Sequence, residues 1–249
     1  MRKDSRPCIS ADAVTTWIET EKKTLHVRGA SDALRLASGK ANNVRLRARA
    51  CRLLGLLGAK QAIPVLLQIG QVEDSEELTW EALSALGFIR SHRATKPLIE
   101  VVRTAGDVRK KQAAAYALWL IGDNRARNTF IRVAEDRAED ETTRGFAVEG
   151  LGSLKPTART VTVLVRALRD PSVNVRFSAL CALSGAAVLA VNQKVRPEVR
   201  LLLTRRAIPA IRCRLQDKSE IKGEGTVAEL AGTTLSNFVR LKAALRPRG

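Results

Sequence analysis

Apolar residues recur with a helical period along the middle of the chain. Between residues 78 and 90, Leu78, Ala82, Ala85 and Ile89 are separated by three or four positions. This spacing puts them on one side of a helix and predicts one buried face. The same pattern predicts further helices at residues 46–58, 110–122, 143–155 and 175–187.

These five segments repeat at a nearly constant interval. In one reference column, steps of 32, 32, 33 and 32 residues separate Gly55, Gly87, Trp119, Gly152 and Ser184. Small residues, which let helices pack closely, fill a second column at Ala50, Ala82, Ala114, Ala147 and Ala179. Shorter apolar helices are predicted to follow the first four segments, at residues 62–69, 94–102, 126–134 and 158–168.

The repeating unit is therefore a helix–turn–helix of about 32 residues. No such unit can bury its apolar face alone, so stacking of neighbours must supply the core. We expect an all-α solenoid of about five repeats, forming a single domain over residues 1–249, with no sheet. Residues 1–43 are expected to form an N-terminal cap or degenerate repeat with helices at 11–22 and 31–38. Residues 44–190 hold the repeats, and residues 191–249 form a basic C-terminal cap with helices at 198–215 and 226–245.

The repeat resembles the HEAT repeat, in the short subtype named after the phycobilin lyases (PBS lyase HEAT-like). The segment Asp170-Pro171-Ser172-Val173-Asn174-Val175-Arg176, followed by Ala179, Ala182 and Leu183, is the nearest match. The turn of that subtype is matched by residues 54–58 and 120–123. The resemblance implies a right-handed solenoid. It does not decide the function, because this repeat serves scaffolds, lyases and other enzymes.

Composition narrows the function classes. The chain has 43 basic and 25 acidic residues, a net charge of +18, which favours acidic partners. Cys8, Cys51, Cys181 and Cys213 have no CxxC spacing and there are only two histidines, so we expect no metal and no cofactor. Cys51 and Cys181 lie in apolar stretches and are expected in the core.

The chain is expected to be cytoplasmic. Its size and cysteine usage suit a reducing compartment. Residues 1–13 have no apolar run and do not form a signal peptide. The apolar stretch at 179–191 is shorter than the roughly 20 residues that a membrane-spanning helix needs.

Arginines recur at equivalent positions of the second helices. Three equivalent sets are Arg93, Arg125 and Arg159; Arg132 and Arg166; and Arg103 and Arg169. The resemblance implies that second helices line a concave face, where these side chains would form a basic stripe for phosphates or an acidic peptide. The alternative is an ordinary solvated face, interrupted by Glu100 and Glu135.

Two further basic sets have structural alternatives. Residues 177–249 hold 13 basic and 5 acidic residues, with a candidate patch at Arg205, Arg206, Arg212, Arg214, Arg246 and Arg248. This patch suits nucleic acid or a membrane surface, or it merely caps the solenoid. Near the starts of the first helices, the resemblance implies structural pairing with an Asp or with helix-end carbonyls for Arg47, Lys111, Arg144 and Arg176.

Three classes of HEAT-like enzyme each need residues that can be sought in this sequence. The His-Glu pairs of deoxyhypusine hydroxylases are absent, since Val27 follows His26 and Arg93 follows His92. Alkylpurine DNA glycosylases use a Trp, an Asp and an Arg, which Trp119, Asp123 and Arg159 offer; however, Asp123 is also the repeat's ordinary turn residue. No residue set marks the bilin pocket of a phycobilin lyase.

We therefore expect a non-catalytic scaffold or adaptor, without catalytic residues, that binds along its concave face. Its partner would be an acidic protein or peptide, with nucleic acid as a second option; a small molecule is not expected. The alternative is a HEAT-like enzyme of the DNA glycosylase or phycobilin lyase type. Trp80 and Tyr116 are expected to pack within or between repeats.

Overall fold

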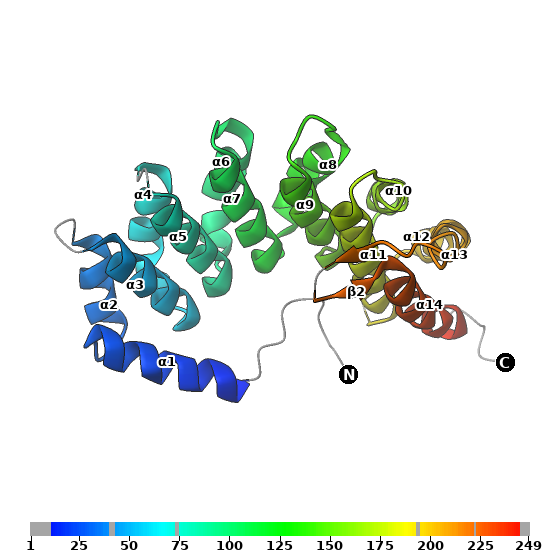
Figure 1. Cartoon of the computed structure of the whole chain (residues 1–249). Helices are drawn as coiled ribbons and strands as arrows, with labels where there is room; N and C mark the ends of the chain where they lie inside the picture. Colours follow the sequence, from blue (N-terminus) through cyan, green and yellow to red (C-terminus); the bar gives the residue numbers. More distant parts are fainter. Residues whose placement is uncertain (1–10, 40–42, 73–74, 193–194, 222, 245–249) are drawn as a thin grey trace. The chain divides into compact units, whose positions relative to one another are not determined.

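The structure, a computed structural model, describes residues 11–39, 43–72, 75–192, 195–221 and 223–244. The chain divides into two compact units, an N-terminal unit ending at Ala126 and a C-terminal unit beginning at Arg127. In each unit, antiparallel helices stack side by side (Figure 1). This arrangement confirms the predicted all-α solenoid.

The N-terminal unit places its helices in two rows. The first helices α3, α5 and α7 pack directly on one another, whereas α4 and α6 pack on α5 and α7 (Figure 1). The helices are α1 (Ala11–Leu25), α2 (Ala30–Ser38), α3 (Val44–Leu56), α4 (Ile63–Val72), α5 (Glu76–Ile89), α6 (Thr95–Thr104) and α7 (Val108–Ile121). Single 3-10 turns are η1 (Lys60–Ala62), η2 (His92–Ala94) and η3 (Asn124–Ala126).

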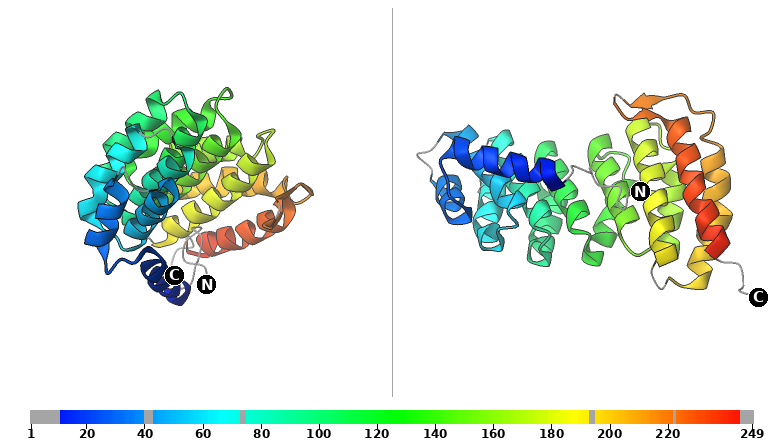
Figure 2. Two further views of the ribbon diagram at one scale, coloured as in Figure 1. Left: turned by 60° about the vertical axis from the view of Figure 1, so that its left-hand side comes forward. Right: turned by 90° about the horizontal axis from the view of Figure 1, so that it is seen from below.

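The C-terminal unit continues the same order. Helix α8 packs on α9, α9 on α11, and α11 on α14, which runs alongside it (Figure 2). Helix α10 contacts α8, α9, α11 and α12. The helices are α8 (Arg127–Glu135), α9 (Glu141–Ser153), α10 (Ala158–Ala167), α11 (Val173–Asn192), α12 (Pro197–Leu202), α13 (Ile208–Arg212) and α14 (Val227–Ala244).

Polar residues define where the first helices begin. The side chains of Asn43, Ser75, Asp107 and Asp140 precede α3, α5, α7 and α9, and each accepts a hydrogen bond from a backbone N–H of the first turn. These bonds satisfy donors that have no partner inside the helix. The observed helices therefore start about two residues before the ranges expected from apolar periodicity.

The reference column of glycines is explained by backbone contact between first helices. A Cβ atom on Gly55 would lie 2.8 Å from Ala85 Cα, and one on Gly87 would lie 2.8 Å from Ala117 Cα. In the C-terminal unit, a Cβ on Gly152 would lie 2.3 Å from Ala182 Cα. At these three glycines the helices thus approach too closely for a side chain.

Gly152→Ala is expected to destabilise the C-terminal unit by about 1 to 3 kcal/mol, because α9 and α11 must move apart to admit the methyl group. The thermal unfolding midpoint, followed by circular dichroism, measures the loss. The control is Gly232→Ala in α14, where a Cβ would meet no described atom within 4 Å. This control is expected to keep or slightly raise the midpoint, since alanine favours helix. Equal midpoints for both variants would contradict the close-contact explanation.

Polar and aromatic side chains connect successive first helices. Arg49 donates from Nε and Nη2 to the Glu21 carboxylate at 2.9 and 3.0 Å, and Arg52 binds Glu81 in the same two-pronged way. The rings of Trp80 and Tyr116 stack at 6.1 Å between centroids. These last two residues thus pack between repeats, as predicted.

In the C-terminal unit, the Ser178 hydroxyl of α11 donates to Glu149 Oε1 of α9 at 2.9 Å. Burial raises the pKa of Glu149 to about 7, and the nearby Glu224 carboxylate adds to the increase, against the lowering effect of the Ser178 bond. Burial likewise raises the pKa of the Cys181 thiol to about 12.

Two expectations near the C-terminus are wrong. Strands β1 (Glu220–Ile221) and β2 (Gly225–Thr226) form an antiparallel hairpin where no strand was expected. Two residues are too few to show alternation, and the turn relies on the positive φ angles of Gly223 and Gly225. The helix expected at 198–215 is split by a π-helical segment (Leu203–Ala207). Pro209 explains the split, because it has no N–H for a regular helical bond.

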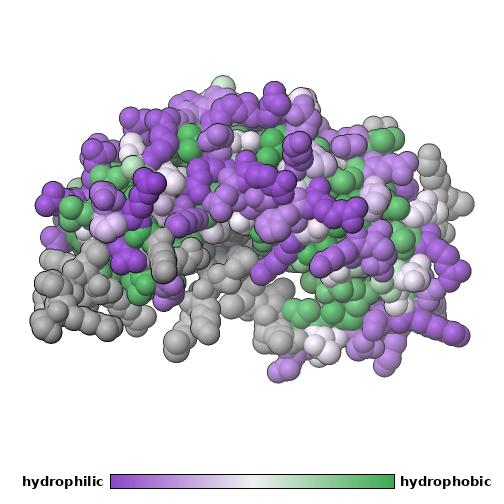
Figure 3. Space-filling model, turned by 180° about the vertical axis from the view of Figure 1, so that it is seen from behind, coloured by the Kyte–Doolittle hydropathy of each residue, from purple (hydrophilic) through white to green (hydrophobic). Residues whose placement is uncertain are grey.

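One helix among the described residues, α11, is long and apolar enough by composition to cross a membrane. However, 56% of its apolar window is buried inside the protein, as in the core helix of a folded domain. Seen from behind, the described surface is mainly hydrophilic, with apolar side chains exposed between the polar ones (Figure 3).

Candidate functional site

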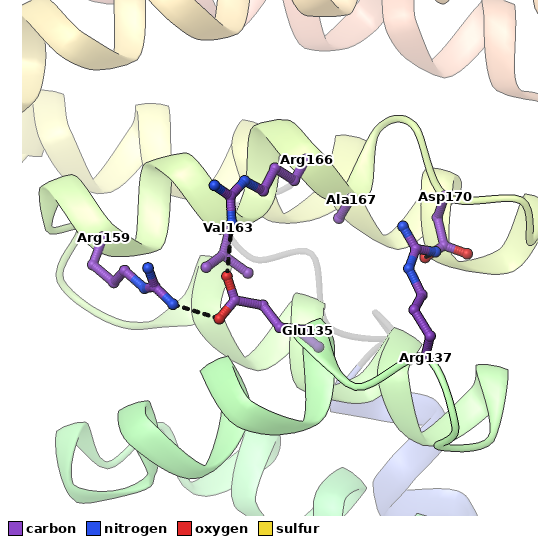
Figure 4. Close-up of a pocket in the computed structure, with 8 residues that line it drawn as sticks. Glu135, Arg137, Arg159, Val163, Arg166, Ala167 and Asp170 are labelled. Atoms are coloured by element: carbon purple, nitrogen blue, oxygen red, sulfur yellow. Dashed lines mark hydrogen bonds and ion pairs between the residues drawn. The ribbon is translucent and has the colours of Figure 1, made fainter.

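An open cavity of about 370 Å³ lies between α8 and α10 of the C-terminal unit (Figure 4). We call it the arginine pocket, because three of its charged lining residues are arginines. Its lining consists of Ala134, Glu135, Arg137, Arg159, Val163, Arg166, Ala167 and Asp170.

Helical spacing brings these residues to one place. Arg159, Val163 and Arg166 are spaced by four and three positions along α10, so they share one face. Glu135 is the last residue of α8, and Arg137 follows it in the turn before α9. The pocket therefore combines one helix face with the end of a neighbouring helix.

Glu135 bridges two of the arginines. Arg159 Nη2 donates to Glu135 Oε2 at 2.5 Å, and Arg166 Nη1 donates to Glu135 Oε1 at 3.2 Å (Figure 4). The side chains of Arg159 and Arg166 are 58% and 68% exposed. Ion pairs this exposed each contribute only about 0 to 1 kcal/mol, so the bridge can open at little cost.

Asp170 closes the other end of the pocket and is buried. Its carboxylate accepts hydrogen bonds from Arg144 Nη2 at 3.1 Å, from Arg137, and from the backbone N–H of Ser172 at 2.9 Å. The Arg144 side chain is only 6% exposed, whereas that of Arg137 is 58% exposed. Asp170 thus joins a buried structural partner to a solvent-facing one.

The structural pairing expected for basic residues of the first helices is present at three positions. Arg144 binds Asp170 of the next turn, and Arg47 Nε donates to the Ala37 carbonyl at 3.0 Å. Arg176 donates to the carbonyls of residues 170 and 171 and also pairs with Asp217 at 2.8 Å.

The other arginines of the expected stripe have different surroundings. Arg132 and Arg169 are exposed and meet no partner among the described residues of the C-terminal unit. In the N-terminal unit, Arg93 is exposed in the same way, and Arg103 pairs with Glu100 of its own helix at 3.0 Å. Arg125 binds Asp123 and the His92 carbonyl.

Asp123 has a structural environment. It is buried and accepts hydrogen bonds from Thr95 Oγ1 at 2.9 Å, from the Arg125 guanidinium and from the Arg125 backbone N–H, and its carboxylate lies 3.0 Å from His92 Nδ1. Burial alone would raise the pKa of Asp123, but these bonds hold that pKa well below its usual range. Trp119 is also buried and packs edge-on against Tyr116. Both side chains therefore have structural roles.

The expected C-terminal patch lies partly on the π-helical segment (Leu203–Ala207) and on α13. Arg205, Arg206 and Arg212 are exposed, and Arg214 pairs with Asp217 at 3.5 Å. Arg246 and Arg248 lie outside the described residues. Within the described ranges, no group of three or more His, Cys, Asp or Glu side chains could hold a metal ion.

Sequence reasoning identified Arg159 and Arg166 as candidates but missed two features of the pocket. It treated Glu135 as an interruption of the stripe, whereas the structure makes it their shared partner. It passed over Arg137, which lies in a turn outside the repeated columns. The adjacency of Arg137 to the acidic cluster at residues 139–141 was the available signal.

Solved structures with stacked helical repeats are similar in fold. The complex of CpcE and CpcF of phycocyanin lyase from Nostoc sp. PCC7120 is 20% identical, with a TM-score of 0.53 over 70% of this chain and 98% of that chain. The archaeal HEAT-like repeats protein from Thermococcus onnurineus NA1 is 14% identical, with a TM-score of 0.54 over 95% and 99% of the two chains. A designed armadillo repeat protein in complex with peptide (KR)4 is 19% identical, with a TM-score of 0.51 over 89% and 99%.

At these low identities the similarity concerns the fold alone. No curated protein sequence matches the chain. The family model for HEAT repeats matches twice, at residues 32–119 and 96–184, which together make up more than half of the sequence. The chain therefore belongs to the HEAT-repeat family.

Proposed function

We propose that this protein is a non-catalytic scaffold that binds an acidic segment of a partner protein along α8 and α10. The observation that carries the proposal is the Glu135 bridge, in which a carboxylate already lies between the guanidinium groups of Arg159 and Arg166. An acidic group of the partner segment would meet the same two guanidinium groups. Exposed Arg132 and Arg169 extend the positive surface beyond the pocket.

Two further observations support this function. HEAT and armadillo solenoids often act as protein-binding scaffolds, and the designed armadillo neighbour carries a bound peptide. Cys51, Cys181 and Cys213 are free thiols, which suits a reducing compartment and a cytoplasmic location. A catalytic role for Trp119 and Asp123 is not proposed, because their buried contacts explain them.

The proposal is tested with a fluorescein-labelled peptide of alternating Glu and Gly residues, whose binding is followed by fluorescence anisotropy. The double variant Arg159→Gln/Arg166→Gln is expected to weaken binding about tenfold, since it removes two exposed ion pairs that contribute up to about 1 kcal/mol each. Raising the salt from about 50 to 200 mM should also weaken binding, because screening shortens the range of charge attraction.

The matched control is Arg109→Gln, which removes one exposed arginine from α7 in the N-terminal unit. It changes the net charge without altering α8 or α10 and should leave the affinity within about twofold. A double variant that binds the peptide as well as the unaltered protein would contradict the proposed site.

A further inference from the structure

We propose that the arginine pocket recognises a phosphomonoester dianion, such as the phosphate of a phosphorylated side chain. This inference rests on the proposed function and names the chemical group of the partner segment that enters the pocket. It is carried by the charge balance of the pocket, by the exposure of three of its arginines and by the competing carboxylate of Glu135.

The charges around the cavity do not balance internally. Among the described residues, the four arginines Arg137, Arg144, Arg159 and Arg166 form ion pairs with two carboxylates, those of Glu135 and Asp170. The ion-paired cluster therefore has a net charge of +2. A phosphomonoester carries a charge of about −1.5 to −2 near neutral pH, so one such group neutralises the cluster.

Arg137 can turn towards a ligand without leaving Asp170 unpaired. Asp170 keeps the buried guanidinium of Arg144 and the backbone N–H of Ser172 when Arg137 moves. The Arg137 side chain is 58% exposed, so little packing restrains it. Arg137, Arg159 and Arg166 all line the cavity, with the Arg137 guanidinium beside Asp170 and the other two at Glu135 (Figure 4). A turn of the Arg137 side chain would therefore bring a third guanidinium group to a bound ligand.

Glu135 discriminates against a carboxylate ligand in the pocket itself. An incoming carboxylate would replace one single-charged group with another and would also lose its own freedom of motion on binding. A phosphate dianion brings a second charge and a third acceptor oxygen, enough for three guanidinium groups. Glu135 is the last residue of α8 and can turn into solvent when it is displaced.

The test compares two acidic peptides that differ at one central position, which holds either phosphoserine or glutamate. Isothermal titration calorimetry at pH 7.5 measures their affinities. We expect the phosphorylated peptide to bind at least about tenfold more tightly, in line with one or two additional charge-assisted hydrogen bonds. Equal affinities would overturn the inference while leaving the proposed function in place; loss of binding for both peptides would overturn both.

Three variants locate the effect in the pocket. Arg137→Gln and Arg166→Gln should each reduce the preference for phosphoserine at least fivefold. Glu135→Gln should increase the affinity for phosphoserine severalfold, because it removes the internal competitor. Arg109→Gln, on α7 and outside the pocket lining, is the control and should keep the preference. A Glu135→Gln variant with weakened phosphoserine binding would contradict the competition argument.

Two additional probes distinguish other sources of phosphate. Inorganic phosphate that binds as tightly as the phosphopeptide, with the same dependence on Arg137, would support the pocket chemistry and assign it to a free phosphate compound. Duplex DNA offers phosphodiesters with one charge each. DNA that binds more tightly than the phosphopeptide, through Arg137 and Arg166, would overturn the inference in favour of nucleic acid.

Discussion

Asp170→Ala is expected to lower the free energy of unfolding of the C-terminal unit by about 3 to 5 kcal/mol. The carboxylate of Asp170 forms an ion pair with Arg144, whose side chain is 6% exposed. Removing one member of a buried pair leaves the other charge buried without compensation, and this penalty exceeds the value of the pair itself. The substitution also removes the acceptor for the backbone N–H of Ser172 at the start of the turn.

Urea unfolding followed by far-ultraviolet circular dichroism measures this loss. Trp17, Trp80 and Trp119 are the only tryptophans of the chain and all lie in the N-terminal unit, so tryptophan fluorescence follows that unit separately. The control is Arg137→Gln, which removes the exposed partner of the same carboxylate and should cost less than about 1 kcal/mol. A loss of similar size in both variants would show that burial of Arg144 does not determine the effect.

Glu149 is expected to make the stability of the C-terminal unit fall as the pH rises from about 4.5 to about 7. Burial raises its pKa in the folded state from 4.5 to about 7, so between these values the folded state holds a proton that the unfolded state has lost. Stability then decreases with pH, by about 3 kcal/mol in total for a shift of this size. The penalty is absent below the unfolded pKa and complete above the folded one.

Glu149→Gln removes the titration and should remove this dependence, so that the variant is more stable than the unaltered protein at pH 8 and close to it at pH 4. Urea unfolding at the two pH values measures the difference. Glu198→Gln, an exposed carboxylate of α12, is the control and should follow the unaltered protein. A Glu149→Gln variant with the original pH dependence would mean that another group titrates.

The helices could be predicted from the sequence because each buries a stripe of apolar residues at regular spacing. The glycines of the reference column could be predicted as helix contacts for a similar reason, since three of the five repeats have glycine at that position. The hairpin of β1 and β2 and the π-helical segment before Pro209 could not, because each occurs once and involves too few residues to form a pattern.

The candidate site was only partly predictable, since some of its residues recur in the repeat and others do not. Arg159 and Arg166 follow the repeat and were found through it. Arg137 comes from a turn outside the repeated positions. The bridging role of Glu135 depends on the distance between α8 and α10, which an alignment of the repeats does not give. Arg125 shows the converse, because it follows the same column as Arg159 but binds Asp123 within its own turn.

The polar pairs between first helices have a consequence for the order of the repeats. Alanine and leucine columns are shared by all repeats, so any two of them could bury one another about equally well. Arg52 of α3, however, can form its ion pair only with a helix that has a carboxylate at the right position. Helix α5 has Glu81 there, whereas α7 has Ala113 at the equivalent position and would leave the Arg52 guanidinium without a carboxylate. The pair between α3 and α5 thus favours the stacking of this repeat on its own successor. The outward-facing residues take no part in this choice and remain free to change.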